Sequence, residues 1–354
     1  MNDLPPLARF AGRVATGLLD ITHDPEALDS EGFWAVVHGF EGRLTCARFR
    51  DVRFLPQPTR RVRWRGPGPE QWTTSLDRAA YTAGVRRIRE HIAAGEVYQA
   101  NLCRVLSAPV AADADIEALA ERLAARHRAP YAGMIRLPAR GVEVVSASPE
   151  LFLRRTGRVV ESGPIKGTGR TEADLLDKDH AENVMIVDLV RNDLGRVCAT
   201  GSVTVPELCA VEKHPGLVHL VSTVRGELRS GAGWAELLAA TFPPGSVTGA
   251  PKDSALGIIR ALETAPRGPY CGGVGWVDAD RRSGELAVGI RTFWIDRARE
   301  RLNFGAGAGI TWGSDPEREW QETELKAARL LAIASNGPAA EDDQPEPTAV
   351  MSGA

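Results

Sequence analysis

Hydrophobic and polar positions along this chain repeat with two periods, and each period predicts one kind of element. Between Ser75 and Gly95 the apolar residues Tyr81, Val85 and Ile88 recur three or four positions apart. This spacing is typical of one face of a helix, with Ser75 as the N-cap and Gly95 as the stop. Similar patterns predict helices over 172–193, 234–241 and 254–265, and over 316–334 after an Asp-Pro start.

Strand patterns occupy much of the remaining chain. In the segment Val97–Leu106, alternation puts Gln99 and Asn101 on one face and Ala100 and Leu102 on the other. The polar pair is open to two interpretations, a solvated face or a functional one. Many strands beside few but long helices predict an α+β fold with packed sheets covered by helices. Further strands are predicted over 134–137, 142–147, 151–154, 203–205, 217–224, 273–277, 285–294 and 301–306.

The length of 354 residues allows one large domain or two ordinary ones. Residues 1–75 are rich in Arg, Pro and Gly, and we expect a short N-terminal segment that packs on the core. Residues 76–335 are expected to form the main domain. The tail 336–354, rich in Pro, Ala and acidic residues, is predicted to be disordered.

Composition excludes several classes of protein. The net charge of −3 provides no basic field for nucleic acid. The 5 cysteines are scattered and include no Cys-x-x-Cys pair, so neither a disulfide framework nor a thiolate zinc site is expected. No stretch approaches the roughly 18 apolar residues of a membrane span, and the N-terminus does not resemble a signal peptide. A cytoplasmic protein is therefore expected.

Acidic residues with matched spacing lie on two of the predicted helices. Asp179 and Glu182 are three apart on one helix, and Glu319 and Glu322 are three apart on the other, with Lys326 four further on. Such spacings place side chains on one helical face. Oxygen-only ligands of this kind suit Mg²⁺. Spacing alone equally fits two ordinary charged helix faces.

Three further features carry candidate chemistry. Residues 304–310 hold glycines at alternate positions, which allows backbone N–H groups to approach an anion or allows close sheet packing. Arg291 lies within an apolar strand pattern, as an edge residue or a carboxylate clamp. Lys166 lies between a strand and a polar turn, where a lysine is either solvated or a nucleophile when its pKa is lowered.

Several stretches, taken in order over about residues 76–334, resemble the chorismate-utilising enzymes, a family that includes anthranilate, aminodeoxychorismate, isochorismate and salicylate synthases. So many ordered matches favour the functional interpretation of the features above. The stretches are GEVYQANL at 95–102, SPELF at 148–152, PIKGT at 164–168, KDHAENVMIVDL at 178–189, RNDLGR at 191–196, HLVST at 219–223, FPPGSVTGAPK at 242–252, GIRT at 289–292, and 307–326.

The resemblance implies a fold and a binding site. The family fold is α+β, with two large packed antiparallel β-sheets flanked by helices, and residues 76–335 would be the chorismate-binding catalytic domain. By resemblance, Glu182 and Glu322, supported by Glu319 and Asp179, would bind Mg²⁺, which would hold the ring carboxylate of chorismate. The residues implied in substrate binding are Gln99, Ser246, Gly249, Arg291, Gly307, Gly309 and Lys326.

Three positions, Gln99, Lys166 and Glu150, indicate the branch of the family, and His219 has a supporting role. Water-adding branches carry a lysine where this chain has Gln99, and a glutamine cannot take up a proton at neutral pH. Lys166 matches the lysine of the aminodeoxychorismate branch, where anthranilate synthases carry alanine. Glu150 matches the general acid, with a pKa expected to be raised by apolar surroundings. His219 matches a supporting histidine near the ring. The resemblance therefore implies amination of chorismate at carbon 4, with anthranilate synthesis as the alternative.

The source of ammonia is expected to be another chain. No Gly-x-Cys-x-Gly nucleophile turn is present, so ammonia is expected from a glutamine amidotransferase subunit in a heterodimer, or from solution. Two rivals from other classes are a catalytically idle chorismate-binding protein and a nucleotide-binding protein that uses the glycine segment. The set Glu150, Lys166, Glu182 and Glu322 argues against the first rival, and the lack of a Gly-Lys-Ser/Thr sequence argues against the second.

Overall fold

The computed structural model describes residues 4–10, 12–54, 63–169, 171–175, 177–214 and 217–336. Its strands join edge to edge in one antiparallel path, which confirms the predicted α+β class with a large antiparallel sheet. In order along this path the strands are β12 (Thr204–His214), β13 (Leu217–Glu227), β10 (Val159–Gly163), β9 (Leu151–Thr156), β16 (Ser283–Val288), β15 (Gly273–Asp278), β3 (Phe33–His38), β4 (Leu44–Phe54), β2 (Arg13–Thr22), β1 (Leu7–Phe10), β7 (Tyr131–Leu137), β8 (Val142–Ser148), β17 (Thr292–Asp296), β18 (Arg301–Ile310) and β6 (Gln99–Pro109).

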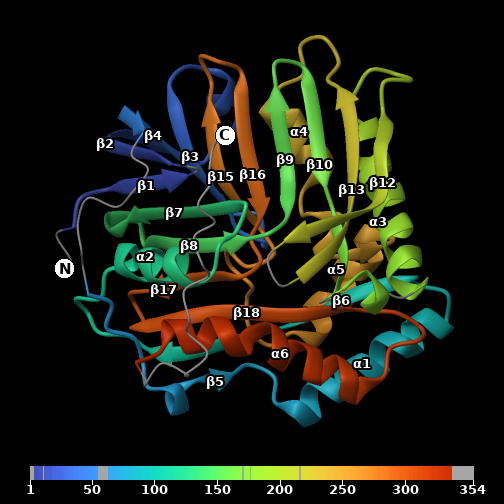
Figure 1. Ribbon diagram of the computed structural model, residues 1–354. Helices are drawn as coiled ribbons and strands as arrows, with labels where there is room; N and C mark the ends of the chain where they lie inside the picture. Colours follow the sequence, from blue (N-terminus) through green and yellow to red (C-terminus); the bar gives the residue numbers. More distant parts are fainter. Residues whose placement is uncertain are drawn as a thin grey trace, which may run out of the picture.

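Three shorter strands lie beside this path. β11 (Ile165–Gly169) pairs with β13, while β14 (Gly249–Ala250) and β5 (Thr73–Thr74) pair with β6. Figure 1 shows β15, β16, β9, β10 and β13 running upright, with β7, β8, β17 and β18 crossing beneath them. The sheet therefore has two differently oriented halves, and the N-terminal strands join them, because β3 pairs with β15 and β1 pairs with β7.

Helices cover both halves of the sheet. α6 lies along β18 at the bottom of Figure 1, beside α1, and α3 lies at the side of β12 and β13. Apolar residues of α3 and α4 complete one core cluster, and residues of α2 and α6 complete a second. The helices are α1 (Arg78–Ala93), α2 (Ile116–Arg126), α3 (Asp177–Gly195), α4 (Trp234–Thr241), α5 (Lys252–Leu262) and α6 (Pro316–Ala334).

The helix starts follow capping chemistry. α6 begins as predicted, because the Asp315 carboxylate accepts from the backbone N–H groups of the first turn and Pro316 occupies the first helical position. The predicted N-cap of α1 is wrong. Ser75 Oγ instead accepts from Val105 N on β6 at 2.9 Å, and Asp77 caps the helix by accepting from Ala80 N at 2.8 Å.

Two other predictions of element boundaries need correction. The strand predicted over 285–294 breaks into β16 and β17, because the chain leaves one half of the sheet and enters the other at this point. Arg291 lies in the break with φ +52°. Helix α2 was missed, although Ile116, Leu119 and Leu123 are buried at helical spacing behind the N-cap Asp115.

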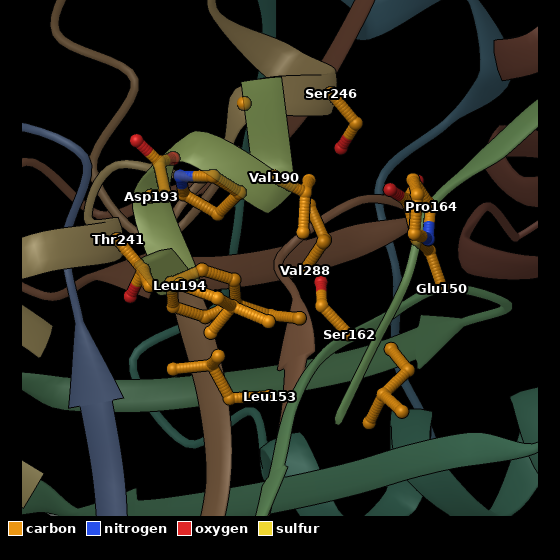
Figure 2. A pocket seen from close by; sticks show the side chains of 14 residues that line it. Glu150, Leu153, Ser162, Pro164, Val190, Asp193, Leu194, Thr241, Ser246 and Val288 are labelled. Carbon is orange, nitrogen blue, oxygen red and sulfur yellow. The ribbon is translucent and has the colours of Figure 1, made fainter. Parts of the chain in front are cut away.

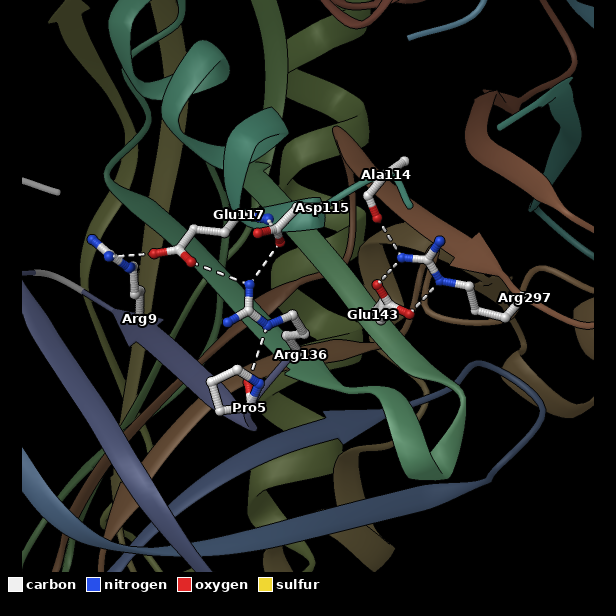
Figure 3. Close-up of polar contacts among 8 residues, drawn as sticks. All are labelled: Pro5, Arg9, Ala114, Asp115, Glu117, Arg136, Glu143 and Arg297. Carbon is white, nitrogen blue, oxygen red and sulfur yellow. Dashed lines mark hydrogen bonds and ion pairs between the residues drawn. The ribbon is translucent and has the colours of Figure 1, made fainter. Parts of the chain in front are cut away.

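Buried ion pairs fasten the first strand to this helix (Figure 3). Arg136 on β7 donates through Nη1 to Asp115 Oδ1 at 2.6 Å and to Glu117 Oε2 at 3.1 Å, and through Nε to Pro5 O at 3.1 Å. Arg9 on β1 also binds Glu117. Residues 337–354 of the predicted disordered tail lie outside the described residues.

Candidate functional site

Lys166 lies close to Gln99 and Gly309, two residues that the sequence had placed in the same site. Lys166 is half-buried on β11, and a methyl group on Gly309 of β18 would lie 3.2 Å from its Nζ and would overlap the Gln99 amide. A side chain at 309 would therefore displace the Gln99 amide. Gly167, with φ +77°, brings β11 against α3, because a methyl group there would lie 3.0 Å from Asp179 Cβ. Three strands and one acidic helix thus approach one point.

The polar face of β6 is buried, so its interpretation as a solvated face is wrong. Gln99 is 0% exposed and donates through Nε2 to Asn101 Oδ1 at 3.2 Å. Gln99 Oε1 has no hydrogen-bond partner among the described residues. A buried acceptor without a partner costs about 1–3 kcal/mol. A ligand that donates a hydrogen bond beside Lys166 would recover that free energy.

Glu150, between β8 and β9, has the properties of a general acid. The side chain is buried, and burial raises its pKa from 4.5 to about 7, as the sequence predicted. A hydrogen bond from Ser246, the positive charge of Lys166 and a backbone hydrogen bond from Ile165 each act in the opposite direction. Near neutral pH Glu150 can therefore hold a proton and release it.

The Glu150 carboxyl lies beside a small, mostly apolar cavity that leaves little room for water. Its volume is about 10 Å³, room for about one water molecule. Figure 2 shows Glu150 and Ser246 on one side of it and Asp193 and Thr241 on the other. Asp193 is held by Lys252 Nζ at 2.5 Å. Apolar side chains form the remaining wall and keep bulk water from the Glu150 carboxyl: Leu151, Phe152, Leu153, Val190, Leu194 and Val288.

The acidic face of α6 points toward β18. Lys326 Nζ lies 2.6 Å from Glu322 Oε1 and donates to Gly307 O at 3.1 Å. Glu319 is buried, and its charge and that of Glu322 add to the effect of burial in raising the pKa of Tyr81. The predicted side chains Glu319, Glu322 and Lys326 therefore gather over the glycine segment, with Glu322 engaged by the lysine.

The second acidic pair, Asp179 and Glu182, is half-buried near the start of α3. Asp179 lies against Gly167, next to Lys166. Within the described ranges, no three His, Cys, Asp or Glu side chains are already grouped closely enough to hold a metal ion. The donors on both helices are nevertheless all carboxylates, the oxygen ligands that Mg²⁺ prefers. The donor chemistry of the two helices thus fits Mg²⁺.

Arg291 is a half-buried cation that has no carboxylate partner in the described part of the chain. Burial lowers its pKa, and its carbonyl accepts from Ala147 N at 3.0 Å, which ties it to the segment leading to Glu150. Other buried arginines each have an acidic partner: Arg104 with Glu324, Arg136 with Asp115 and Glu117, Arg155 with Asp29, and Arg267 with Glu263. A carboxylate on a ligand would give Arg291 the acidic partner that the other buried arginines have.

The other predicted residues line the same region. Ser246 is buried in a short 3₁₀ turn, Gly245–Val247, and contacts Glu150. Gly249 on β14 pairs with Ala100, the neighbour of Gln99. His219 is buried on β13, in register with residue 168 of β11. The sequence reasoning missed His127, whose Nε2 lies 3.5 Å from Arg291 Nη1, because no periodic or motif signal distinguishes a histidine between two arginines.

Comparison with known proteins identifies the family. Residues 40–332 match the chorismate binding enzyme family. The chain is 41% identical over 266 residues to anthranilate synthase component 1 1 of Haloarcula marismortui, covering 72% of this chain and 53% of that protein. It is 38% identical over 272 residues to aminodeoxychorismate synthase component 1 of Salmonella typhimurium, covering 73% and 58%. The chain thus spans between about half and three fifths of the length of these relatives.

A solved structure agrees with the fold. Anthranilate synthase component I from Streptococcus pneumoniae superposes with a TM-score of 0.76 at 22% identity, covering 94% of this chain and 93% of that one. Within the described residues, no helix has the length and apolar character needed to cross a membrane. The match over residues 40–332 and the two relatives establish that this chain belongs to the chorismate-binding enzyme family.

Proposed function

We propose that this protein aminates chorismate at ring carbon 4 and so forms 4-amino-4-deoxychorismate, the precursor of p-aminobenzoate. The observation that carries the proposal is the position of Lys166 Nζ, against Gly309 and beside the buried Gln99 amide. Glu150, with its pKa raised to about 7, lies close enough to that amine for the positive charge of Lys166 to act on its pKa. The proposal thus draws on an amine and a protonatable carboxyl that are neighbours, as a nucleophile and a general acid would have to be.

The proposed reaction has two halves, and atoms balance in each. The unprotonated Lys166 amine bonds to ring carbon 2, both ring double bonds shift, and the carbon-4 hydroxyl leaves as water with the proton of Glu150. The lysine nitrogen then passes one proton to the Glu150 carboxylate, which restores the acid. Ammonia next adds at carbon 4, the double bonds shift back, and the bond between carbon 2 and the lysine nitrogen breaks. That nitrogen takes up a proton from the new ammonium group.

Binding of a dianion would use both ends of the site. Arg291 would pair with the enolpyruvyl carboxylate, near the backbone of Gly307 and Gly309. Glu182 and Glu322, with Glu319 and Asp179 in support, would hold Mg²⁺. When bound, Mg²⁺ supplies positive charge that fixes the ring carboxylate. Lys326, Ser246 and Gly249 would line the same pocket.

Anthranilate synthesis is the alternative, and the name of the Haloarcula relative favours it. Anthranilate forms by amination at carbon 2 with loss of pyruvate, which needs no amine from the protein at that carbon. The Lys166 amine beside Gly309 is a group for which anthranilate synthesis has no use, and this supports the carbon-4 route. The two reactions differ in product mass and in release of pyruvate.

Ammonia would come from a partner. The "component 1" in the names of both relatives supports a complex with a second subunit, and we propose a glutamine amidotransferase in that role. Free ammonium at high concentration should replace it. The isolated chain can therefore be assayed alone.

The test uses chorismate, ammonium and Mg²⁺ with three proteins: wild type, Lys166→Ala and Lys213→Ala. Lys213 is an exposed lysine paired with Glu172, so its replacement controls for loss of a charge. We expect wild type and the control to yield the carbon-4 amine, identified by mass spectrometry and NMR. Lys166→Ala should lose at least about 10²-fold in rate while it still binds chorismate. An unchanged yield of the carbon-4 amine from Lys166→Ala would refute the covalent route.

A further inference from the structure

The end of α2 meets Arg291 through a single histidine. His127 caps the helix, with its N–H donating to Leu123 O at 2.7 Å, and its Nε2 lies 3.5 Å from Arg291 Nη1. The same helix end is fastened to α6, because Arg329 Nη2 donates to Arg126 O at 2.9 Å. His127 therefore links Arg291 to the end of α2, which Arg329 in turn fastens to α6.

The His127 ring is neutral under ordinary conditions. Burial lowers its pKa from 6.5 to about 4, and the positive charges of Arg291 and Arg329 add to the effect. A guanidinium group only donates hydrogen bonds, so Nε2 of the neutral ring must accept from Arg291 and Nδ1 must carry the proton. Arg291 thus has an acceptor that brings no negative charge.

This arrangement differs from that of other buried arginines. Arg136 and Arg267 each face a carboxylate that both orients and neutralises the guanidinium. A neutral acceptor orients one N–H group and leaves the positive charge and the other donors to a ligand. The backbone of Arg291 is strained, at φ +52°, and such strain is often found at functional sites.

The geometry points to His127 as a positioning residue that orients the Arg291 guanidinium toward a carboxylate of the substrate without neutralising it. This inference rests on the proposed binding of chorismate, but not on the position that is aminated. It assigns to the site a residue that lies within the matched range 40–332 but in none of the short motifs quoted from the sequence. An acidic side chain at 127 would have the opposite effect, because it would pair with Arg291 and compete with the substrate.

The experiment measures equilibrium binding of chorismate, without ammonia, to wild type and variants. We expect His127→Ala to bind about fivefold more weakly, as for loss of one hydrogen bond, and His127→Gln, which still offers an acceptor, to stay within about twofold. His127→Glu should bind at least about tenfold more weakly. His91→Ala, another histidine near a helix end, paired with Glu96, is the matched control and should bind as wild type does.

A double-mutant cycle decides whether His127 acts through Arg291. If it does, Arg291→Ala/His127→Ala binds no more weakly than Arg291→Ala alone. Additive losses, or equal losses in His127→Ala and His127→Gln, would overturn the inference. Wild type that binds chorismate but releases anthranilate would refute the proposed amination and leave these results valid. Failure of wild type to bind chorismate would overturn both.

Discussion

Replacing Glu150 by glutamine removes a charge that the fold accommodates poorly, and this should make the protein more stable at high pH. Glu150 is 4% exposed and lies against the apolar wall of the cavity. Burial raises its pKa to about 7, despite the hydrogen bond from Ser246 and the charge of Lys166. Glutamine has nearly the same shape and no charge, so the Glu150→Gln variant isolates the electrostatic cost.

The magnitude follows from proton linkage. Below pH 4.5 both the folded and the unfolded chain hold the proton, and Glu150 costs nothing in the free energy of unfolding. Between pH 4.5 and about 7 the unfolded chain has lost the proton while the folded chain keeps it, so stability falls as pH rises. Above pH 7 the full cost, about 3 kcal/mol, is present.

Urea unfolding of wild type and Glu150→Gln at pH 5.5 and pH 8 measures this cost. The difference in the free energy of unfolding should shift by about 2 kcal/mol in favour of the variant between these two values. Any effect of glutamine on packing is the same at both and cancels. In Ser246→Ala, loss of a hydrogen bond to the carboxylate should move the titration above pH 7. A stability difference that is independent of pH would refute the account of burial.

Three other substitutions probe the site and its support. Gly309→Ala should lower kcat/KM by at least about 10²-fold without loss of fold, because the new methyl group overlaps the Gln99 amide. Product formation measures the rate and circular dichroism measures the fold. The control Gly313→Ala, with open space at its Cα, should be neutral. Arg136→Met should lower the free energy of unfolding by about 3–5 kcal/mol in urea, because the buried Asp115 carboxylate loses its cationic partner and Glu117 keeps only Arg9, whereas Arg191→Met, at an exposed pair, should cost at most about 1 kcal/mol. Glu322→Gln should abolish or weaken the dependence of activity on Mg²⁺, and an unchanged Mg²⁺ titration would contradict its role as a ligand.

Local signals in the sequence predict those elements whose causes are local. The start of α6 follows from its N-cap Asp315 and from Pro316. Helix α4 matches its predicted range because its apolar residues repeat at helical spacing. The shared face of Gln99 and Asn101 on β6 also follows from alternation in the strand, although their burial does not, because both faces of β6 are covered. In each case the pattern and the tertiary environment impose the same conformation.

Features that depend on distant segments were not predictable in this way. The cap of α1 moves from Ser75 to Asp77 because β6, about 30 residues later, takes the serine hydroxyl. The break at Arg291 depends on two halves of a sheet that bind the chain before and after it. Spacing predicted the acidic pair on α6, but only the fold shows that Lys326 holds Glu322. The role of His127 depends on one contact across 164 residues of sequence.

The site differs from the rest of the molecule in how its polar groups are satisfied. Buried charges elsewhere are neutralised within the chain, as at Arg267 with Glu263 and at Lys252 with Asp193. In the site, by contrast, Arg291 has no carboxylate within the described residues, and Gln99 Oε1 has no donor there. Each group costs free energy of folding, and a ligand with a carboxylate and a hydrogen-bond donor would return it. The missing internal partners therefore weaken the fold at this site. They also indicate which groups a ligand must carry there: a carboxylate and a hydrogen-bond donor.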